Sequence, residues 1–95
     1  MKILRLPICK RWFNMIASGE KKEEYRNAGV YWTARLTAGP YDYVEFRNGY
    51  QLDSPRILVE YLGFRLGRGK KKWGAPDYAV YVIKLGTIKG DGPHA

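Results

Sequence analysis

The chain has little of what disulfide-bonded, metal-binding and membrane proteins need. Its 95 residues include one cysteine, Cys9, and one histidine, His94. A lone thiol cannot close an internal disulfide, and one Cys with one His is too few for a zinc site, so we expect no structural metal. No apolar run approaches the roughly 18 to 20 residues of a membrane span, and Arg5, Pro7 and Lys10 interrupt the N-terminal apolar stretch that a signal peptide requires. We therefore expect a cytoplasmic protein without membrane association.

Two sources of easily recognised chemistry are missing as well. The sequence Gly-Arg-Gly-Lys at residues 67–70 lacks both the spacing and the hydroxyl residue of a triphosphate-binding loop. No histidine occurs outside the C-terminal segment, which removes the simplest acid–base group for a ribonuclease at neutral pH. We expect no cofactor.

Basic residues outnumber acidic ones. Seventeen Lys and Arg face nine Asp and Glu, which gives a formal charge of +8. Such a charge attracts polyanions at long range, so RNA or a nucleotide is the leading class of partner. Two alternatives stay open: the charge confers solubility and nothing more, or the basic face meets an acidic protein partner.

The length and composition fit one small domain. Ninety-five residues are too few for two cores, and 45% hydrophobic with 15% aromatic residues can build one. We expect an α+β domain over residues 1–86, followed by a flexible tail over residues 87–95 that is rich in glycine and polar residues.

Apolar spacing predicts two helices near the N-terminus. A short strand over Lys2–Leu6 comes first, and Pro7 marks its end. The next stretch has a helical period and ends at Gly19, where a left-handed residue fits. A second periodic stretch ends at the Gly-Pro pair of residues 39–40. The expected apolar faces are Cys9, Trp12, Phe13 and Ile16 in the first helix and Val30, Tyr31, Ala34 and Leu36 in the second.

The rest of the chain reads as strands. Tyr41–Arg47, Arg56–Leu66 and Tyr78–Leu85 are rich in β-branched and aromatic residues. Asn48 and Gly49 suit a tight hairpin turn, but a second break near Pro55 makes a longer ordered loop an equal alternative. About five strands and two helices indicate a small barrel or curled sheet.

The polar segment from Gly19 to Arg26 is the strongest candidate site. Six of its eight residues are charged, with both signs, and it lies between the two expected helices. An exposed, charged edge strand is the alternative. In a straight strand Lys21 and Glu24 would point to opposite faces, so the two can meet only if the backbone bends between them.

The spacing of Gly19, Lys21, Glu24 and Arg26 resembles the G-x-K-x-x-E-x-R signature of the ASCH domain family. Further similarity lies in residues 6–19, in the stretch Tyr-Asp-Tyr-Val-Glu-Phe-Arg-Asn-Gly-Tyr at residues 41–50, and in Trp-Gly-Ala-Pro at residues 73–76 with the strand that ends at residues 84–86. The resemblance thus covers the chain from Met1 to about Gly86.

The resemblance implies a PUA-like β-barrel that binds RNA or a nucleotide in a cleft beside the first helix. It also offers a second hypothesis, because some family members are amidohydrolases acting on acylated cytidine and ribonuclease activity is attributed to others. The amidohydrolase lysine falls on Lys21, whereas its threonine is replaced by Glu24. An enzyme would therefore use Lys21 and Glu24, with a second carboxylate from either Glu45 or Glu60.

For binding, the same resemblance and the residue types nominate a larger set. Cationic and carboxylate side chains can hold phosphate and base amino groups, and aromatic side chains near turns can stack on bases. The expected ligand-binding residues are Lys21, Glu24, Tyr25, Arg26, Arg47, Asn48, Tyr50 and Trp73.

A second basic cluster occupies the loop before the last strand. Its side chains could follow a phosphate backbone without reading sequence, and a solvated loop tip is the alternative. This cluster comprises Arg65, Arg68, Lys70, Lys71 and Lys72, and we call it the basic loop.

Overall fold

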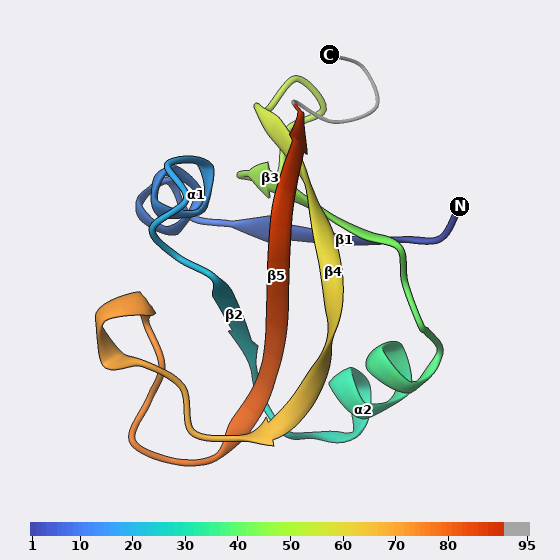
Figure 1. Ribbon diagram of the computed structural model, residues 1–95, viewed down its shortest axis with the longest axis vertical. Coiled ribbons are helices and arrows are strands. Elements are labelled where there is room, and N and C mark those ends of the chain that lie inside the picture. The colour runs from blue at the N-terminus through green and yellow to red at the C-terminus, as the bar shows by residue number, and fades with distance from the viewer. Residues whose placement is uncertain (91–95) are drawn as a thin grey trace.

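The computed structural model describes residues 1–90 and has five strands in one curled sheet, with two helices in the N-terminal half (Figure 1). The α+β prediction, with about five strands and two early helices, is confirmed. In chain order the elements are β1 (Ile3–Ile8), α1 (Lys10–Ala17), β2 (Glu23–Arg26), α2 (Val30–Thr37), β3 (Tyr43–Asn48), β4 (Arg56–Gly67), a 3-10 turn η1 (Lys71–Trp73) and β5 (Val80–Gly90).

The sheet has the strand order β1-β3-β4-β5-β2. The pairing of β1 with β3 is parallel and the other three pairings are antiparallel. The long strands β4 and β5 form the middle, with register shifts between Leu58 and Phe64 that allow the sheet to curl. The half-barrel therefore has two edge strands, β1 and β2.

One apolar core lies inside the curl. Alternate residues of β1, Leu4, Leu6 and Ile8, are buried there with Phe13 and Ile16 of α1, as the strand and helix periods require. Two expectations for this core are wrong. Cys9 is exposed because it precedes α1 as its N-cap residue. Only Leu36 of the second apolar face is buried, because α2 lies at the rim of the sheet.

One expected boundary is wrong, and the choice between two open alternatives is decided by the structure. Pro7 lies within β1 rather than ending it, and an edge strand tolerates a residue without an N–H group. The link from Asn48 to Pro55 is the longer ordered loop and not a tight hairpin, held by the Asn48 N–H bonded to the Pro55 carbonyl at 2.9 Å.

The last strand continues beyond the expected domain end at Gly86. β5 runs to Gly90, and Ile88 pairs with Val59 and packs against the core. Residues 87–90 are therefore strand and not tail, because this apolar side chain holds them on the sheet. The remainder of the expected tail, residues 91–95, lies outside the described residues.

Within residues 1–90 no helix has the length and apolar character needed to cross a membrane. The same part of the chain has no group of three or more His, Cys, Asp or Glu side chains placed to hold a metal ion.

Candidate functional site

The link between α1 and β2 has the bend that the sequence required. Gly19 adopts φ +85° after the helix, and the Lys21 N–H turns back to the Met15 carbonyl at 3.0 Å. Because β2 begins at Glu23, Lys21 precedes the strand, and its side chain does not have to follow the alternation of side chains between the two faces of the sheet. Lys21 Nζ lies 3.3 Å from Glu24 Oε1, so the two side chains do meet.

Lys21 is 2% exposed, an unusual position for a lysine. Its ammonium group donates to the Trp73 carbonyl at 2.6 Å and faces the rings of Trp12 and Tyr25 at 5.2 and 4.7 Å. Burial lowers the pKa of Lys21, and the neighbouring Glu24 carboxylate opposes this shift. The site thus has a cation fixed by a carboxylate, a carbonyl and two aromatic faces.

Glu24 also holds Arg26. Its Oε2 atom lies 2.9 Å from Arg26 Nη1, so one buried carboxylate joins two cations. Arg26 Nη2 donates to the Pro7 carbonyl at 3.3 Å, and the guanidinium lies 5.2 Å from the centre of the Trp32 ring. Arg26 Nε is buried and has no hydrogen-bond partner within residues 1–90. The guanidinium is therefore fixed in position, with one N–H group not bonded.

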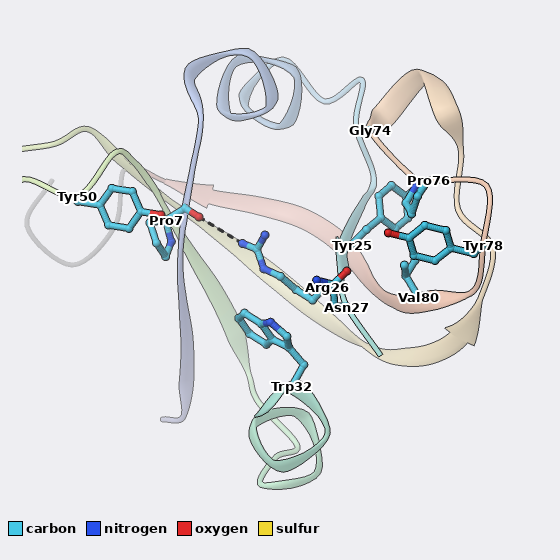
Figure 2. Close-up of a pocket in the computed structure, with 10 residues that line it drawn as sticks. All are labelled: Pro7, Tyr25, Arg26, Asn27, Trp32, Tyr50, Gly74, Pro76, Tyr78 and Val80. Carbon is cyan, nitrogen blue, oxygen red and sulfur yellow. Dashed lines mark hydrogen bonds between the residues drawn. The ribbon is translucent and has the colours of Figure 1, made fainter. Parts of the chain in front are cut away.

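A cleft of about 530 Å³ opens beside this guanidinium (Figure 2). Arg26 extends towards Pro7 in the middle of the view, with Trp32 on one side and Tyr25 and Tyr78 towards the loop that follows β4. The cleft lies between Pro7 of the edge strand β1 and Tyr25 and Arg26 of the edge strand β2. Its lining comprises Pro7, Tyr25, Arg26, Asn27, Trp32, Tyr50, Gly74, Pro76, Tyr78 and Val80.

Tyr25 connects β2 to the loop that follows β4 by two hydrogen bonds. Its hydroxyl donates to Glu23 Oε1 at 2.7 Å and accepts from the Lys70 N–H at 2.9 Å. Burial raises the pKa of Tyr25, and the Glu23 carboxylate adds to this shift. The phenol is thus neutral at physiological pH and anchors the loop of residues 68–79 beside the strand.

The structure divides the expected binding residues into three groups. Tyr25, Arg26 and Tyr50 line the cleft. Lys21 and Glu24 are not among the lining residues, and both are buried beside them. Trp73 is also buried, with its carbonyl bonded to Lys21 and its ring beneath the ammonium groups of Lys70 and Lys72 at 4.5 and 5.3 Å.

The remaining two expected residues lie elsewhere. Asn48 ends β3 opposite Ile8 and is not a lining residue of the cleft. Arg47 lines a second hollow of about 90 Å³, together with Arg5, Leu6, Pro7 and Glu45. In this hollow Glu45 is 4% exposed, with Oε1 3.5 Å from Arg5 Nε. Its Oε2 atom is buried and has no hydrogen-bond partner within the described part of the chain.

Sequence reasoning missed most of the cleft wall. Trp32 and Tyr78 were assigned to a helix and a strand, although Tyr78 is 60% exposed and precedes β5. A large aromatic side chain next to a loop was the available signal. The other missed lining residues, which have no such signal, are Pro7, Asn27, Gly74, Pro76 and Val80.

The basic loop is partly neutralised by neighbours. Lys71 Nζ lies 2.8 Å from Asp77 Oδ1, and Arg65 lies 3.9 Å from Glu23. Lys70 and Lys72 rest on the Trp73 ring, and no acidic group of residues 1–90 forms an ion pair with either. Arg68 is exposed and likewise forms no ion pair there, so Lys70, Lys72 and Arg68 are the cations of the loop left for a phosphate.

The chain matches no protein-family model, and comparisons with the curated proteins and with the solved structures also found no match.

Proposed function

We propose that this protein binds single-stranded RNA or a nucleotide in the cleft, as a compact member of the ASCH family. The observation that carries the proposal is the combination of one fixed guanidinium with four aromatic side chains around a single cleft. These are Arg26 with Tyr25, Trp32, Tyr50 and Tyr78.

The chemistry of the lining suits a nucleotide. Arginine donates to phosphate oxygens and aromatic faces stack on unpaired bases. A volume of about 530 Å³ lies within the range of about 300–1,000 Å³ found for small-ligand sites. The formal charge of +8 adds long-range attraction for a polyanion.

The family assignment is supported by the contacts of the signature residues. Lys21, Glu24 and Arg26 form one connected ion-pair network, and Gly19 supplies the positive φ that brings Lys21 towards it. The spacing of the signature thus has a physical basis in this fold, since these four positions depend on one another.

Binding is favoured over catalysis by where Lys21 and Glu24 lie. A catalytic acid or base has to come within hydrogen-bond reach of its substrate. Both side chains are at most 5% exposed, and neither lines the cleft. Their contacts fix Arg26 and the Trp73 carbonyl, which makes them supports for the binding surface.

The test is fluorescence anisotropy with labelled single-stranded RNA octamers and with mononucleotides at low salt. Tyr78→Ala removes a stacking ring from the cleft and should weaken RNA binding by about fivefold or more, since stacking on one base contributes about 1–3 kcal/mol. Leu66→Ala is the control, because Leu66 is an apolar side chain similarly exposed at 61% against 60% and does not line the cleft. Absence of RNA and nucleotide binding would overturn the proposal and favour an acidic protein partner.

A second candidate, an enzyme acting on RNA or a modified nucleoside, draws on one observation. Lys21 has a lowered pKa and lies 3.3 Å from Glu24, a pair able to move a proton. Incubation with RNA and with acylated cytidine tests for product. Turnover that is lost in folded Lys21→Ala and Glu24→Ala variants would replace the binding proposal with a catalytic one.

A further inference from the structure

The hollow at Glu45 is lined by the polar side chains of Arg5, Glu45 and Arg47, none of which lines the cleft. Arg5 of β1 and Glu45 of β3 are register partners on neighbouring parallel strands, and Arg47 follows two residues later on the same face. Pro7 lines both this hollow and the cleft, so the two adjoin. A chain bound in the cleft can therefore continue into the hollow.

Glu45 has an acceptor that the protein leaves unused. The side chain is 4% exposed, between the core residues Val44 and Phe46 in the sequence of β3. Arg5 approaches one carboxylate oxygen, while Oε2 is buried without a hydrogen-bond partner in the part of the chain that the structure describes. Buried acceptors are nearly always bonded, so Oε2 is suited to receive an N–H group from a ligand.

The charges offer donors beside an acceptor. Two guanidinium groups and one carboxylate surround the hollow, so their net charge of +1 disfavours a cation, and a ligand edge with both an N–H donor and an acceptor suits it. The Arg47 side chain forms no hydrogen bond or ion pair within residues 1–90 and can donate to an acceptor. A volume of about 90 Å³ corresponds to roughly three waters, enough for the edge of a planar ring and too small for a whole nucleotide.

We propose that this hollow reads one base of the bound RNA and prefers a base with an exocyclic amino group, which cytosine, adenine and guanine carry and uracil lacks. This inference rests on the proposed RNA binding in the cleft. The amino group donates to Glu45 Oε2, and the adjacent ring nitrogen accepts from Arg47, a pairing of carboxylate with base amino group that is common in nucleic-acid recognition. Uracil is disfavoured because two carbonyl oxygens flank its N3–H and face the carboxylate.

Anisotropy titrations with oligo-C, oligo-A and oligo-U octamers at one salt concentration test the preference. Wild-type protein should bind the C and A octamers about tenfold more tightly than the U octamer, the size expected of one hydrogen bond to a charged group. Glu45→Gln should remove the difference, because an amide can turn either its oxygen or its NH₂ towards the base. Glu60→Gln is the matched control: Glu60 is also a strand glutamate, its Oε1 accepts from the Thr87 N–H at 3.2 Å, and it does not line the hollow.

A change in the probe tests the same contact without altering the protein. An octamer of N4,N4-dimethylcytidine lacks the amino hydrogens and should bind wild-type protein no better than the U octamer. Equal affinity of wild-type protein for C, A and U octamers overturns this inference but leaves the proposal of binding in the cleft intact. A base preference that remains in Glu45→Gln also overturns this inference alone. If no octamer binds, this inference fails, and the proposed function fails with it unless a mononucleotide still binds.

Discussion

Arg26 on one edge strand of the sheet donates a hydrogen bond of 3.3 Å to the carbonyl of Pro7 on the other edge strand. The same guanidinium is held by Glu24 at 2.9 Å and lines the cleft. One side chain thus connects the two open edges of the half-barrel and presents a cation to the cleft. Its replacement should change stability and binding together.

Arg26→Lys tests this double role. A lysine keeps the charge but cannot reach both Glu24 and the Pro7 carbonyl with a planar fork of donors. We expect the free energy of unfolding to fall by about 1–3 kcal/mol, the range for lost hydrogen bonds to charged groups, and RNA binding to weaken. Urea denaturation measures the first effect and anisotropy the second.

Arg68→Lys is the control for this substitution, because Arg68 is exposed and its side chain has no hydrogen bond or ion pair within residues 1–90. Its stability should stay within about 0.5 kcal/mol of wild type, as for most surface changes. If Arg26→Lys is equally neutral, the link between the edge strands has no role in stability.

Lys21 should make stability depend on pH. Its pKa in the folded protein lies below the ordinary value of 10.5 because of burial. Between the two values the unfolded chain binds more protons than the folded one, so the free energy of unfolding rises with pH. The slope from this one group is at most about 1.4 kcal/mol per pH unit. Urea denaturation in the pH range just below 10.5 should show a slope of this sign in wild type and its loss in Lys21→Met.

Lys22→Met provides the comparison, since Lys22 is the adjacent lysine and its side chain is exposed. That variant should keep the slope of the wild-type protein. A Lys21→Met protein with an unchanged slope would show that Lys21 carries its proton equally in both states.

Gly74 should be intolerant of a side chain for two reasons. It adopts φ +97°, and an added Cβ would lie 2.8 Å from Cζ2 of Trp12, whose ring also faces Lys21. Gly74→Ala should destabilise the protein by more than the roughly 1–2 kcal/mol of left-handed strain alone. Gly19→Ala isolates the strain, because Gly19 has φ +85° and no atom within 4 Å of the added Cβ. Equal losses of stability in the two variants would mean that Trp12 moves aside at little cost.

The fold could be predicted from the sequence because the residue patterns that indicate its strands and helices are local. Alternation in β1 and β4 and the helical spacing of Phe13 and Ile16 each act over a few residues. The burial of α2 was misjudged because the position of a helix at the rim of a sheet depends on partners far along the chain. Val30 shows the error, since it is 90% exposed despite its apolar character.

Part of the candidate site could also be predicted from the sequence, because that part depends on local contacts. Lys21 and Glu24 were expected to meet through a bend and they do, because both lie in one short segment. That they lie behind the cleft and not in it depends on Trp73, which comes from the distant loop and covers Lys21. The pairing of Arg5 with Glu45 follows from the parallel register of β1 and β3, which no local pattern predicts.

The basic loop gives a prediction about salt. Lys70 and Lys72 lie on the Trp73 ring without an acidic partner in residues 1–90, whereas Lys71 is paired with Asp77. If the first two lysines contact phosphates, replacing both with glutamine should reduce the slope of log affinity against log salt by about 1.4, or about 0.7 for each contact with a single strand. Lys71→Gln should change the slope less, because its cation already has a counter-charge.

The salt titration needs a control for net charge. The double variant Lys10→Gln/Lys89→Gln removes the same two charges from exposed sites in α1 and β5, outside the basic loop and the cleft lining. Long-range attraction depends on total charge, and ion release depends on local contact with phosphate. A reduced slope in the Lys70/Lys72 variant alone therefore assigns the contacts to the loop. Equal slopes in the two double variants would leave the basic loop as a solvated tip and confine RNA to the cleft.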